Sequence, residues 1–422
     1  MLREYQKEGI KRLVRGSIIL ADDMGLGKTV QAVYAIESFR RRFGKVKVLV
    51  VCPLTLQSVW LKHLAEWCDQ IPFIVTSTGR FIKNGVTITH YEALSKLKEG
   101  AWDIIIVDEA HKIKNRKAKR TKAVTAITKD AGFVWLLTGT PIMNKVEEVW
   151  TLLHIIDREL YGSYWKFVQT WGTVRQGRYG WIVEKEPRNP ALFALELKPY
   201  VVRRTKEEVL PQLPTLSKVV IDTPMTARQE ELHKKFLEEF KAEVGEEIIY
   251  APYVISQLLR TRQVAISPQL LGDEDIGNKI PVVLDMIEGG NESHIVIFSQ
   301  WTSVLKLLAQ HLSNCHILCG EVPVDKRDDV ITKWREKGGN LLLTLGVGGV
   351  GLTLTEASVC IRMDEAWTPS DNDQAVARIH RIGQTKPAMD YLIRSENSVE
   401  DYVKDVLGGK DRMIKAIMER IK

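Results

Sequence analysis

Seven short apolar runs recur along this chain, separated by longer stretches of mixed character. Within each run nearly every residue is Val, Ile, Leu or another apolar type, rather than every second residue. Strands buried on both faces have this composition, because helices cover both faces of a parallel sheet. The pattern therefore predicts α/β architecture in each half of the chain. The runs lie at 17–21, 46–52, 103–108, 134–139, 294–299, 340–345 and 359–364.

Length and composition agree with two such halves. A chain of 422 residues is long enough for two domains of about 200 residues each. Hydrophobic residues make up 45% and charged residues 27%, which argues against a disordered chain. No segment approaches the ~20 apolar residues of a membrane span, and the N-terminus lacks the apolar stretch of a signal peptide. We therefore expect a cytoplasmic protein, or a nuclear one if the source has a nucleus, with no membrane partner.

The region from about 145 to 275 has a mostly helical pattern. Thr226 and Gln229 predict a capping box at the start of one helix. The proline-bearing stretch 209–215 predicts the connection between the halves. In the helix after Thr226, apolar residues recur every four positions, at Leu232, Phe236 and Phe240.

Positive charge is concentrated in two clusters, although the net charge is only +7. One cluster lies at 40–47 and the other at 112–122. Taken alone, either cluster is a solvated face or a nucleic-acid contact, and the pattern leaves both interpretations open. The second comprises Lys112, Lys114, Arg116, Lys117, Lys119, Arg120 and Lys122.

The stretch "SIILADDMGLGKTV" (17–30) joins an apolar run to a helical pattern through a glycine-bearing loop. Such a loop cradles phosphates at a helix N-terminus, where Lys28 would pair with the β- and γ-phosphates and Thr29 would ligate Mg²⁺. The pattern GxxxxGK[ST] is broken at its first position, which is Asp22. The alternative is a tight strand-to-helix turn that contains a lysine by chance.

Asp108 and Glu109 end the apolar run 103–108 directly before the second basic cluster. A metal-dependent hydrolase site, a nucleotide-hydrolysis site and a buried strand before a solvated turn would each give this order. His111 stands two residues after Glu109, which is the wrong spacing for an HExxH zinc helix. A phosphate loop requires one carboxylate for Mg²⁺ and one for the attacking water, so the pair favours nucleotide hydrolysis.

Four stretches together resemble the motifs of the Swi/Snf-type DNA-dependent ATPases of helicase superfamily 2: "DDMGLGKT" (22–29), "DEAHKIKN" (108–115), "LLTGTPIMN" (136–144) and "DQAVARIHRIGQTK" (373–386). The resemblance covers nearly the whole chain. It implies two RecA-like lobes that bind ATP between them and carry helical protrusions. We accordingly expect lobe 1 at 1–210, with a protrusion at about 145–200, and lobe 2 at 211–422, with a protrusion at about 224–275.

The resemblance also implies roles for individual residues. Arg378 and Arg381 match the family's arginine fingers, and their spacing of three predicts one shared helical face. Asp108 would bind Mg²⁺ with Thr29, and Glu109 would be catalytic with Lys28. His111 would link the pocket to neighbouring motifs. Nucleotide contacts are expected from Gln6, Asp23, Met24, Gly25, Gly27 and Gly351, and DNA contacts from Lys112, Lys114, Asn115, Thr344, Gly348 and Gly349.

The function that the resemblance implies is an ATP-driven motor that translocates on double-stranded DNA without reading its sequence. A strand-separating DNA or RNA helicase of the DEAH type is the alternative, and a DNA-binding scaffold with an inactive ATPase is a second one. The stretch 176–210 resembles the annealing-helicase and fork-remodelling branch, which implies a role in repair, recombination or fork processing. We expect a monomer, and a module that selects its target is either a separate protein or absent.

Overall fold

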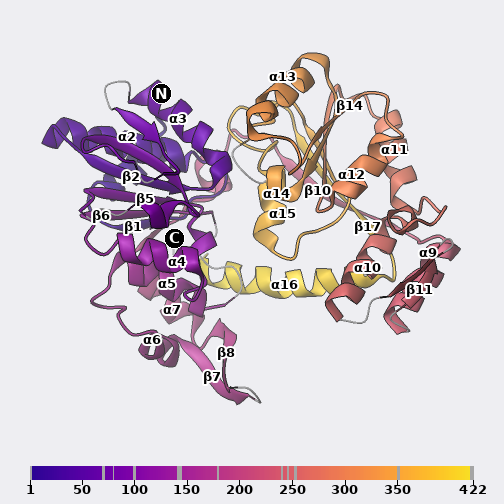
Figure 1. Ribbon diagram of the computed structural model, residues 1–422, viewed down its shortest axis with the longest axis horizontal. Coiled ribbons are helices and arrows are strands. Elements are labelled where there is room, and N and C mark those ends of the chain that lie inside the picture. Colours follow the sequence, from indigo (N-terminus) through magenta and orange to yellow (C-terminus); the bar gives the residue numbers. More distant parts are fainter. Residues whose placement is uncertain are drawn as a thin grey trace. The chain divides into compact units, whose positions relative to one another are not determined.

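The computed structural model describes residues 2–68, 72–78, 80–97, 101–139, 145–177, 180–238, 241–244, 247–250, 254–348 and 352–418. The chain divides into two compact units (Figure 1). The first comprises Met1–Pro211 with Lys410–Lys422, and the second comprises Gln212–Gly409. The division falls within the stretch 209–215 that the sequence marks as the connection. Both units are α/β, as the apolar runs predict.

The first unit is built on a seven-stranded sheet in which every pair of neighbours is parallel. The four apolar runs of this half form strands buried along almost their whole length, which confirms the prediction. In sheet order the strands are β3 (Phe73–Val75), β4 (Gly85–His90), β2 (Lys47–Cys52), β5 (Ile104–Asp108), β6 (Phe133–Leu137), β1 (Ile18–Leu20) and β9 (Val201–Val202).

Helices lie on both sides of this sheet (Figure 1). The helix α2 follows β1 directly, and α4 follows the turn after β5, so the loops that carry the predicted site lie at the carboxyl ends of parallel strands. Open α/β sheets bind ligands at this edge. The helices are α1 (Glu4–Leu13), α2 (Lys28–Phe43), α3 (Gln57–Trp67), α4 (Lys119–Ile127), α5 (Glu147–Ile156), α6 (Tyr164–Trp171), α7 (Pro190–Leu197) and α8 (Lys206–Val209).

The predicted protrusion at 145–200 is only partly helical. Between α6 and α7 an antiparallel hairpin forms from β7 (Gly172–Gly177) and β8 (Gly180–Pro187). β-branched and aromatic residues at Thr173, Val174, Trp181 and Val183 favour strand over helix here. The apolar residues of α5 and α6 pack with those of α7 into the main core of the unit. This protrusion therefore continues the core of the first unit.

The second unit contains a six-stranded sheet, again parallel throughout. Its order is β10 (Leu216–Thr223), β17 (Ala388–Ser395), β16 (Val359–Arg362), β13 (His294–Ser299), β15 (Gly339–Thr344) and β14 (Cys315–Leu318). The three apolar runs of this half form the central strands β16, β13 and β15. The helices are α11 (Lys279–Gly289), α12 (Thr302–Ala309), α13 (Arg327–Lys337), α14 (Leu345–Gly348), α15 (Pro369–Val376) and the first part of α16 (Val399–Met418), which from Lys410 on belongs to the first unit.

The region 224–275 contains α9 (Ala227–Glu238) and α10 (Val254–Ile266), joined through a short hairpin of β11 (Lys241–Val244) and β12 (Glu247–Tyr250). The predicted capping box is confirmed, because the backbone N–H of Gln229 donates to Oγ1 of Thr226 at 3.1 Å and the N–H of Thr226 donates to Oε1 of Gln229 at 3.1 Å. Leu232 and Phe236 are buried, whereas Phe240 lies outside the described residues. Among the helices that the structure describes, none has the length and apolarity of a membrane span.

Candidate functional site

The loop between β1 and α2 has the backbone of a phosphate-binding loop. Gly25 and Gly27 adopt φ values of 89° and 76°, in the left-handed region that only glycine enters at little cost. A Cβ on Gly27 would lie 2.8 Å from Nε2 of Gln6, so this buried amide packs directly on the loop. Helix α2 begins with no acidic residue in its first turn and no side-chain cap at Gly27. Its positive N-terminal end is thereby open to an anion.

Lys28 is held over the loop by backbone carbonyls. Its Nζ donates to the carbonyl oxygens of Asp22 at 2.6 Å and Asp23 at 3.3 Å. Burial lowers the pKa of Lys28, while the nearby carboxylates, Glu109 foremost, act in the opposite direction. Thr29 follows as the second residue of the helix. The structure thus places the lysine, the threonine and the β5 carboxylates in one neighbourhood.

Gly139, which follows β6, closes this neighbourhood from the other side. A Cβ there would lie 2.9 Å from Cγ of Met24 and 3.8 Å from Nζ of Lys28. A side chain at position 139 would therefore have to displace that of Met24. The rest of that motif, residues 140–144, lies outside the described residues.

Asp22, which breaks the phosphate-loop pattern, is fully buried and charge-paired. Arg204 donates from Nε to Oδ1 of Asp22 at 2.8 Å and from Nη2 to Oδ2 at 2.6 Å. Nε2 of Gln31 donates to Oδ2 at 2.9 Å, and Nη2 of Arg204 also donates to Oε1 of Gln31 at 3.0 Å. The departure from glycine therefore has a structural reason: the carboxylate anchors the loop to the segment after β9.

Asp23 makes a second link to the same segment. Its Oδ1 lies 3.2 Å from Nη2 of Arg203, and its Oδ2 accepts from the backbone N–H of Lys206 at 3.2 Å. Nη1 of Arg203 also donates to the carbonyl oxygens of Ala21 and Gly139, each at 3.2 Å. The Asp23 carboxylate thus contacts Arg203 and the backbone of Lys206.

Asp108 ends β5 beside the loop, and Glu109 follows it directly. Nε1 of Trp60 donates to Oδ2 of Asp108 at 2.8 Å, and the backbone N–H of Glu109 donates to Oδ1 at 2.9 Å. Burial and the adjacent Glu109 carboxylate raise the pKa of Asp108 to about 7. Two carboxylates held so close, with one deeply buried, are the arrangement that a divalent cation stabilises.

The backbone turns sharply at Glu109, which adopts the left-handed conformation at φ 53°. The hydroxyl of Tyr91 donates to the carbonyl oxygen of Asp108 at 2.5 Å and fixes the strand end. Nδ1 of His111 lies 3.3 Å from Oε2 of Glu109 and 3.4 Å from Oγ1 of Thr138. His111 therefore connects the carboxylate pair to the "LLTGT" segment, as the sequence predicts.

The basic cluster after Glu109 divides into paired and exposed residues. Nζ of Lys114 lies 3.1 Å from Oε1 of Glu148, and Oδ1 of Asn115 accepts from the backbone N–H of Lys117 at 3.0 Å. Lys112 is half-buried. The side chains further along are exposed: Arg116, Lys117, Lys119, Arg120 and Lys122. In the first basic cluster, by contrast, Glu37 pairs with both Arg40 and Arg41, each at 2.7 Å.

In the second unit, Arg378 and Arg381 converge on one backbone oxygen. Nη1 of Arg378 donates to the carbonyl oxygen of Leu352 at 3.3 Å, and Nη1 of Arg381 donates to it at 3.0 Å. The prediction of a shared helical face is wrong, because α15 ends at Val376 and three-residue turns follow it. The two guanidinium groups are still close together, because both side chains contact the same loop. Burial lowers the pKa of Arg381.

The predicted DNA contacts of the second unit are only partly described. Thr344 is buried at the end of β15, in register with Ser299 at the end of β13. Gly348 ends the short helix α14. Gly349 and Gly351 lie outside the described residues.

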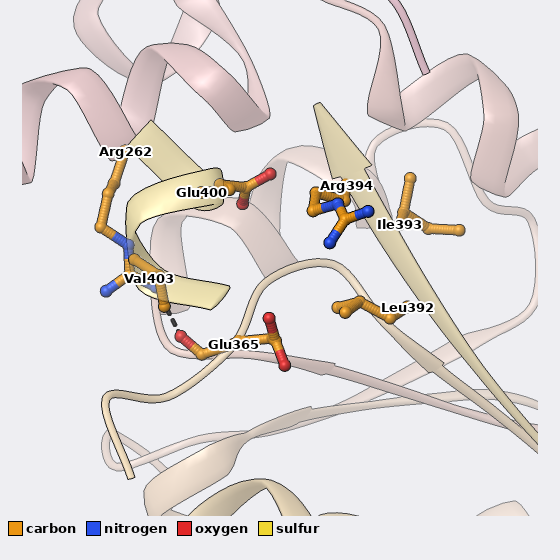
Figure 2. Close-up of a pocket in the computed structure, with 7 residues that line it drawn as sticks. All are labelled: Arg262, Glu365, Leu392, Ile393, Arg394, Glu400 and Val403. Atoms are coloured by element: carbon orange, nitrogen blue, oxygen red, sulfur yellow. Dashed lines mark hydrogen bonds between the residues drawn. The ribbon is translucent and has the colours of Figure 1, made fainter. Parts of the chain in front are cut away.

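A cavity in the second unit lies between β17, the turn after β16 and the start of α16 (Figure 2). Arg262 enters from α10, with its Nη2 donating to the carbonyl oxygen of Glu365 at 2.5 Å. Its guanidinium carbon lies 5.0 Å from the ring of Trp301 and 4.9 Å from that of Trp367. This stacking holds Trp367 against the fold.

Beneath this cavity lies a fully buried lysine. Nζ of Lys279 donates to both carboxylate oxygens of Glu400 at 2.7 Å and to the carbonyl oxygens of Met363 and Ile393 at 2.8 and 2.9 Å. Its charge and donors are satisfied from within the unit. The cavity is thus a structural junction of α10, α11, β17 and α16.

Sequence reasoning missed Arg204, Trp60 and Arg262. The partner of Arg204, Asp22, is 182 positions away. Trp60 and Arg262 carry no local signal, because their partners are 48 and 103 positions away. Such contacts depend on tertiary packing that no periodic pattern encodes.

Comparison with known proteins bears on the whole chain. Residues 5–270 match the model of the SNF2-related domain, and residues 278–383 match that of the helicase conserved C-terminal domain. A curated relative, the ATP-dependent DNA helicase DDM1 of Arabidopsis thaliana, is 27% identical over 95% of this chain and 60% of its own length. The uncharacterized ATP-dependent helicase MG018 of Mycoplasma genitalium is 28% identical over 98% of this chain and 42% of its own length.

Among solved structures, the Sulfolobus solfataricus SWI2/SNF2 ATPase core in complex with dsDNA is 26% identical, with a TM-score of 0.47 over 99% of this chain and 93% of that one. The chain spans only 60% and 42% of the two curated relatives. The assignment to a family depends on the domain model, which matches more than half of the chain. The matched range includes the phosphate loop, Asp108, Glu109 and Arg204. By that match the chain belongs to the SNF2-related family.

Proposed function

We propose that this protein is an ATP-driven motor that translocates on double-stranded DNA. The observation that carries the proposal is that Lys28, at the open N-terminus of α2, lies near enough to the carboxylates of Asp108 and Glu109 to interact with them electrostatically. A lysine that reaches phosphates and two carboxylates with separate duties are what phosphoryl transfer to water requires. Family membership supports the same chemistry.

The residues present fit Mg²⁺ and ATP. The first turn of α2 offers backbone N–H groups and no acid to repel a phosphate. The raised pKa of Asp108 reflects a buried negative charge that a cation would stabilise. Thr29 and Asp108 would hold Mg²⁺, and Gln6, already packed on Gly27, would read the base. When bound, Mg²⁺–ATP supplies the phosphoryl group together with a Lewis acid.

Within this site the protein groups have separate duties. Lys28 would bind the terminal phosphates, and Glu109 would orient the attacking water and take its proton. The contact of His111 with Glu109 keeps that carboxylate directed at the pocket and couples it to Thr138. Asp23 is one of the predicted nucleotide contacts. We infer that it positions the phosphate loop, because its carboxylate contacts Arg203 and the backbone N–H of Lys206.

Arg378 and Arg381 are proposed as the arginine fingers of the second lobe. Planar cations that meet the transferring phosphoryl group are worth about 10³ to 10⁵ in rate. Their shared acceptor, the carbonyl oxygen of Leu352, supports the proposal because it holds both guanidinium groups together. Gly351, directly before that residue, is proposed as a nucleotide contact on the family resemblance alone.

Duplex DNA is proposed as the track. The exposed lysines and arginines of the second basic cluster supply the sequence-independent attraction that a motor requires. The relative DDM1 is named an ATP-dependent DNA helicase. A role in repair, recombination or fork processing, a monomeric state and targeting by a separate protein stay predictions.

Steady-state phosphate release tests the proposal. Turnover is measured with blunt duplex DNA, single-stranded DNA and RNA at equal nucleotide concentration. We expect duplex DNA to stimulate turnover most. Stimulation mainly by RNA or single strands would favour a DEAH-type strand-separating helicase. DNA binding without phosphate release under any condition would favour the inactive scaffold.

A further inference from the structure

A groove in the first unit is walled by the turn after β5, the start of α5, the start of α6, and β8. Its empty space is about 1600 Å³, which includes space open to solvent. Basic, acidic and aromatic side chains share its surface: Lys114, Asn115, Arg116, Lys117, Lys145, Glu147, Glu148, Thr151, Tyr164, Trp165, Trp181 and Val183. Nothing in the nucleotide chemistry proposed above uses its aromatic wall.

Two tryptophans make this wall unusual. Trp165 is 49% exposed and Trp181 is 64% exposed. On β8, Trp181 and Val183 point to the same face, because alternate residues of a strand do so. Val183 packs into the core, so Trp181 extends the core-facing surface of the hairpin out into solvent. An exposed indole that continues an apolar face enlarges the apolar surface that a ligand could cover.

The charges of the groove favour a polyanion. Its four cations exceed its two acids, Glu147 and Glu148, by two. Lys145 lies 3.3 Å from Glu147 and Lys114 lies 3.1 Å from Glu148, so the acids are already paired. Arg116 and Lys117 are left as the exposed positive charge of the groove.

Arg116 also organises the aromatic residues. Its guanidinium carbon lies 3.9 Å from the ring centroid of Tyr164. The Tyr164 hydroxyl donates to Glu147, and the Tyr164 ring lies 5.3 Å from that of Trp165. The guanidinium packs on the phenol, and the Trp165 ring meets the Tyr164 ring edge-on at 70°. A cation beside an exposed indole suits a stacked base next to a phosphate.

A duplex gives such a surface little to bind. Paired bases hide their faces within the helix, and a backbone-tracking motor needs only cations and hydrogen-bond donors. Single strands present free base faces, which stack on aromatic side chains whatever the sequence. An acidic peptide would match the charge but leave both indoles exposed.

We propose that this groove binds a short single-stranded DNA segment of a partly duplex substrate, with unpaired bases stacked on Trp165 and Trp181 and phosphates held by Arg116 and Lys117. The inference rests on the proposed function, since it extends the DNA track of that motor. It adds a preference for DNA that carries an unpaired stretch, which duplex tracking alone does not provide.

Equilibrium binding of the full chain to two fluorescent DNAs tests this. One is a blunt duplex, and the other is the same duplex with a ten-nucleotide dT tail. We expect the tailed DNA to bind roughly tenfold more tightly. Trp181→Ala and Trp165→Ala should each reduce this ratio, and Trp181→Tyr should restore most of it, because tyrosine also stacks. Leu195→Ala on α7, where the side chain is 60% exposed outside the groove, is the matched control and should leave the ratio unchanged.

Salt dependence separates stacking from charge. Lys117→Gln should lower the slope of log Kd against log salt for the tailed DNA, whereas Trp181→Ala should weaken its binding at an unchanged slope. Equal binding of tailed and blunt DNA by the wild-type protein would overturn the proposal. So would a tail preference that survives in the double variant Trp165→Ala/Trp181→Ala. Blunt-duplex stimulation of the wild-type ATPase is measured in parallel, so failure of the motor function is recognised separately.

Discussion

Arg204 and Asp22 form a buried bidentate ion pair across 182 positions of the sequence. The pair joins the first residue of the phosphate loop to the segment that follows the last strand of the same sheet. A glycine at position 22 would leave the arginine without its partner. The loop of this protein is therefore held by an electrostatic anchor as well as by its glycines.

Arg204→Lys should weaken the attachment of the phosphate loop to the segment after β9. Lysine cannot make two parallel hydrogen bonds, and Asp22 is 0% exposed, so part of the carboxylate would be buried without a partner. We expect a loss of about 3 kcal/mol in the free energy of unfolding and a higher KM for ATP. Urea unfolding and steady-state kinetics measure both.

Arg394→Lys is the matched control for that change. Arg394 pairs with Asp222 in the same bidentate way, at 2.6 and 2.9 Å, but Asp222 is an exposed partner in the second unit. This substitution should lower the free energy of unfolding by less than about 1 kcal/mol and leave the KM for ATP unchanged. Equal effects of the two substitutions would contradict an anchoring role for Arg204.

Lys28→Ala and Glu109→Gln should abolish turnover while DNA binding survives. Without Lys28 the phosphates would lose their cation, and an amide in place of the Glu109 carboxylate could not accept the proton of the attacking water. Phosphate release and fluorescence anisotropy with duplex DNA measure the two properties. Residual turnover within about tenfold of wild type for Glu109→Gln would remove this residue from the catalytic role.

Neutralising Lys119 and Lys122 should weaken duplex binding and flatten its salt dependence. Each lost phosphate contact lowers the slope of log K against log salt by about 0.9. Arg40→Gln with Arg41→Gln is the control, because Glu37 already pairs with both arginines and the pKa of Glu37 is lowered to about 2 by these contacts. An unchanged slope for the lysine variant would make those lysines a solvated face.

Acid should destabilise the second unit through His233. Its Nε2 accepts from the backbone N–H of Val399 at 3.1 Å, and burial lowers the pKa of His233 from 6.5 to about 4. Below pH 6.5 His233 is protonated in the unfolded chain but stays neutral in the native state. The free energy of unfolding therefore falls as pH drops toward 4. Between pH 7 and pH 5 the free energy of unfolding should fall by about 2 kcal/mol.

His233→Gln isolates that contribution, because an amide oxygen can accept the same hydrogen bond without titrating. The difference in unfolding free energy between pH 7 and pH 5 should shrink by the same amount in the variant. Urea unfolding at the two pH values measures it. An identical pH dependence for both proteins would show that His233 does not titrate in this window.

The core strands and the catalytic strand ends could be predicted from sequence because burial on both faces leaves a continuous apolar run. Edge strands could not. β10 alternates between exposed and half-buried residues, and β3 has only three residues, so neither gives a run of that kind. The β7–β8 hairpin was hidden within a stretch whose neighbours are helical.

At the candidate site, the residues adjacent in sequence were predicted and their long-range partners were not. Lys28, Asp108 and Glu109 follow from local motifs. The anchoring of Asp22 by Arg204, the Trp60 contact to Asp108 and the turns around Arg381 depend on which segments the fold brings together. Spacing alone suggested a helix at Arg378 and Arg381, although α15 ends before them.

Triplex displacement tests the central claim of translocation on duplex DNA most directly. A labelled third strand is annealed to one end of a blunt duplex, and its release is followed with ATP, without ATP and with the Glu109→Gln variant. We predict ATP-dependent release of the third strand by the wild-type protein alone, with both duplex strands still paired. Hydrolysis of ATP without release of the third strand, or separation of the duplex strands, would contradict the claim.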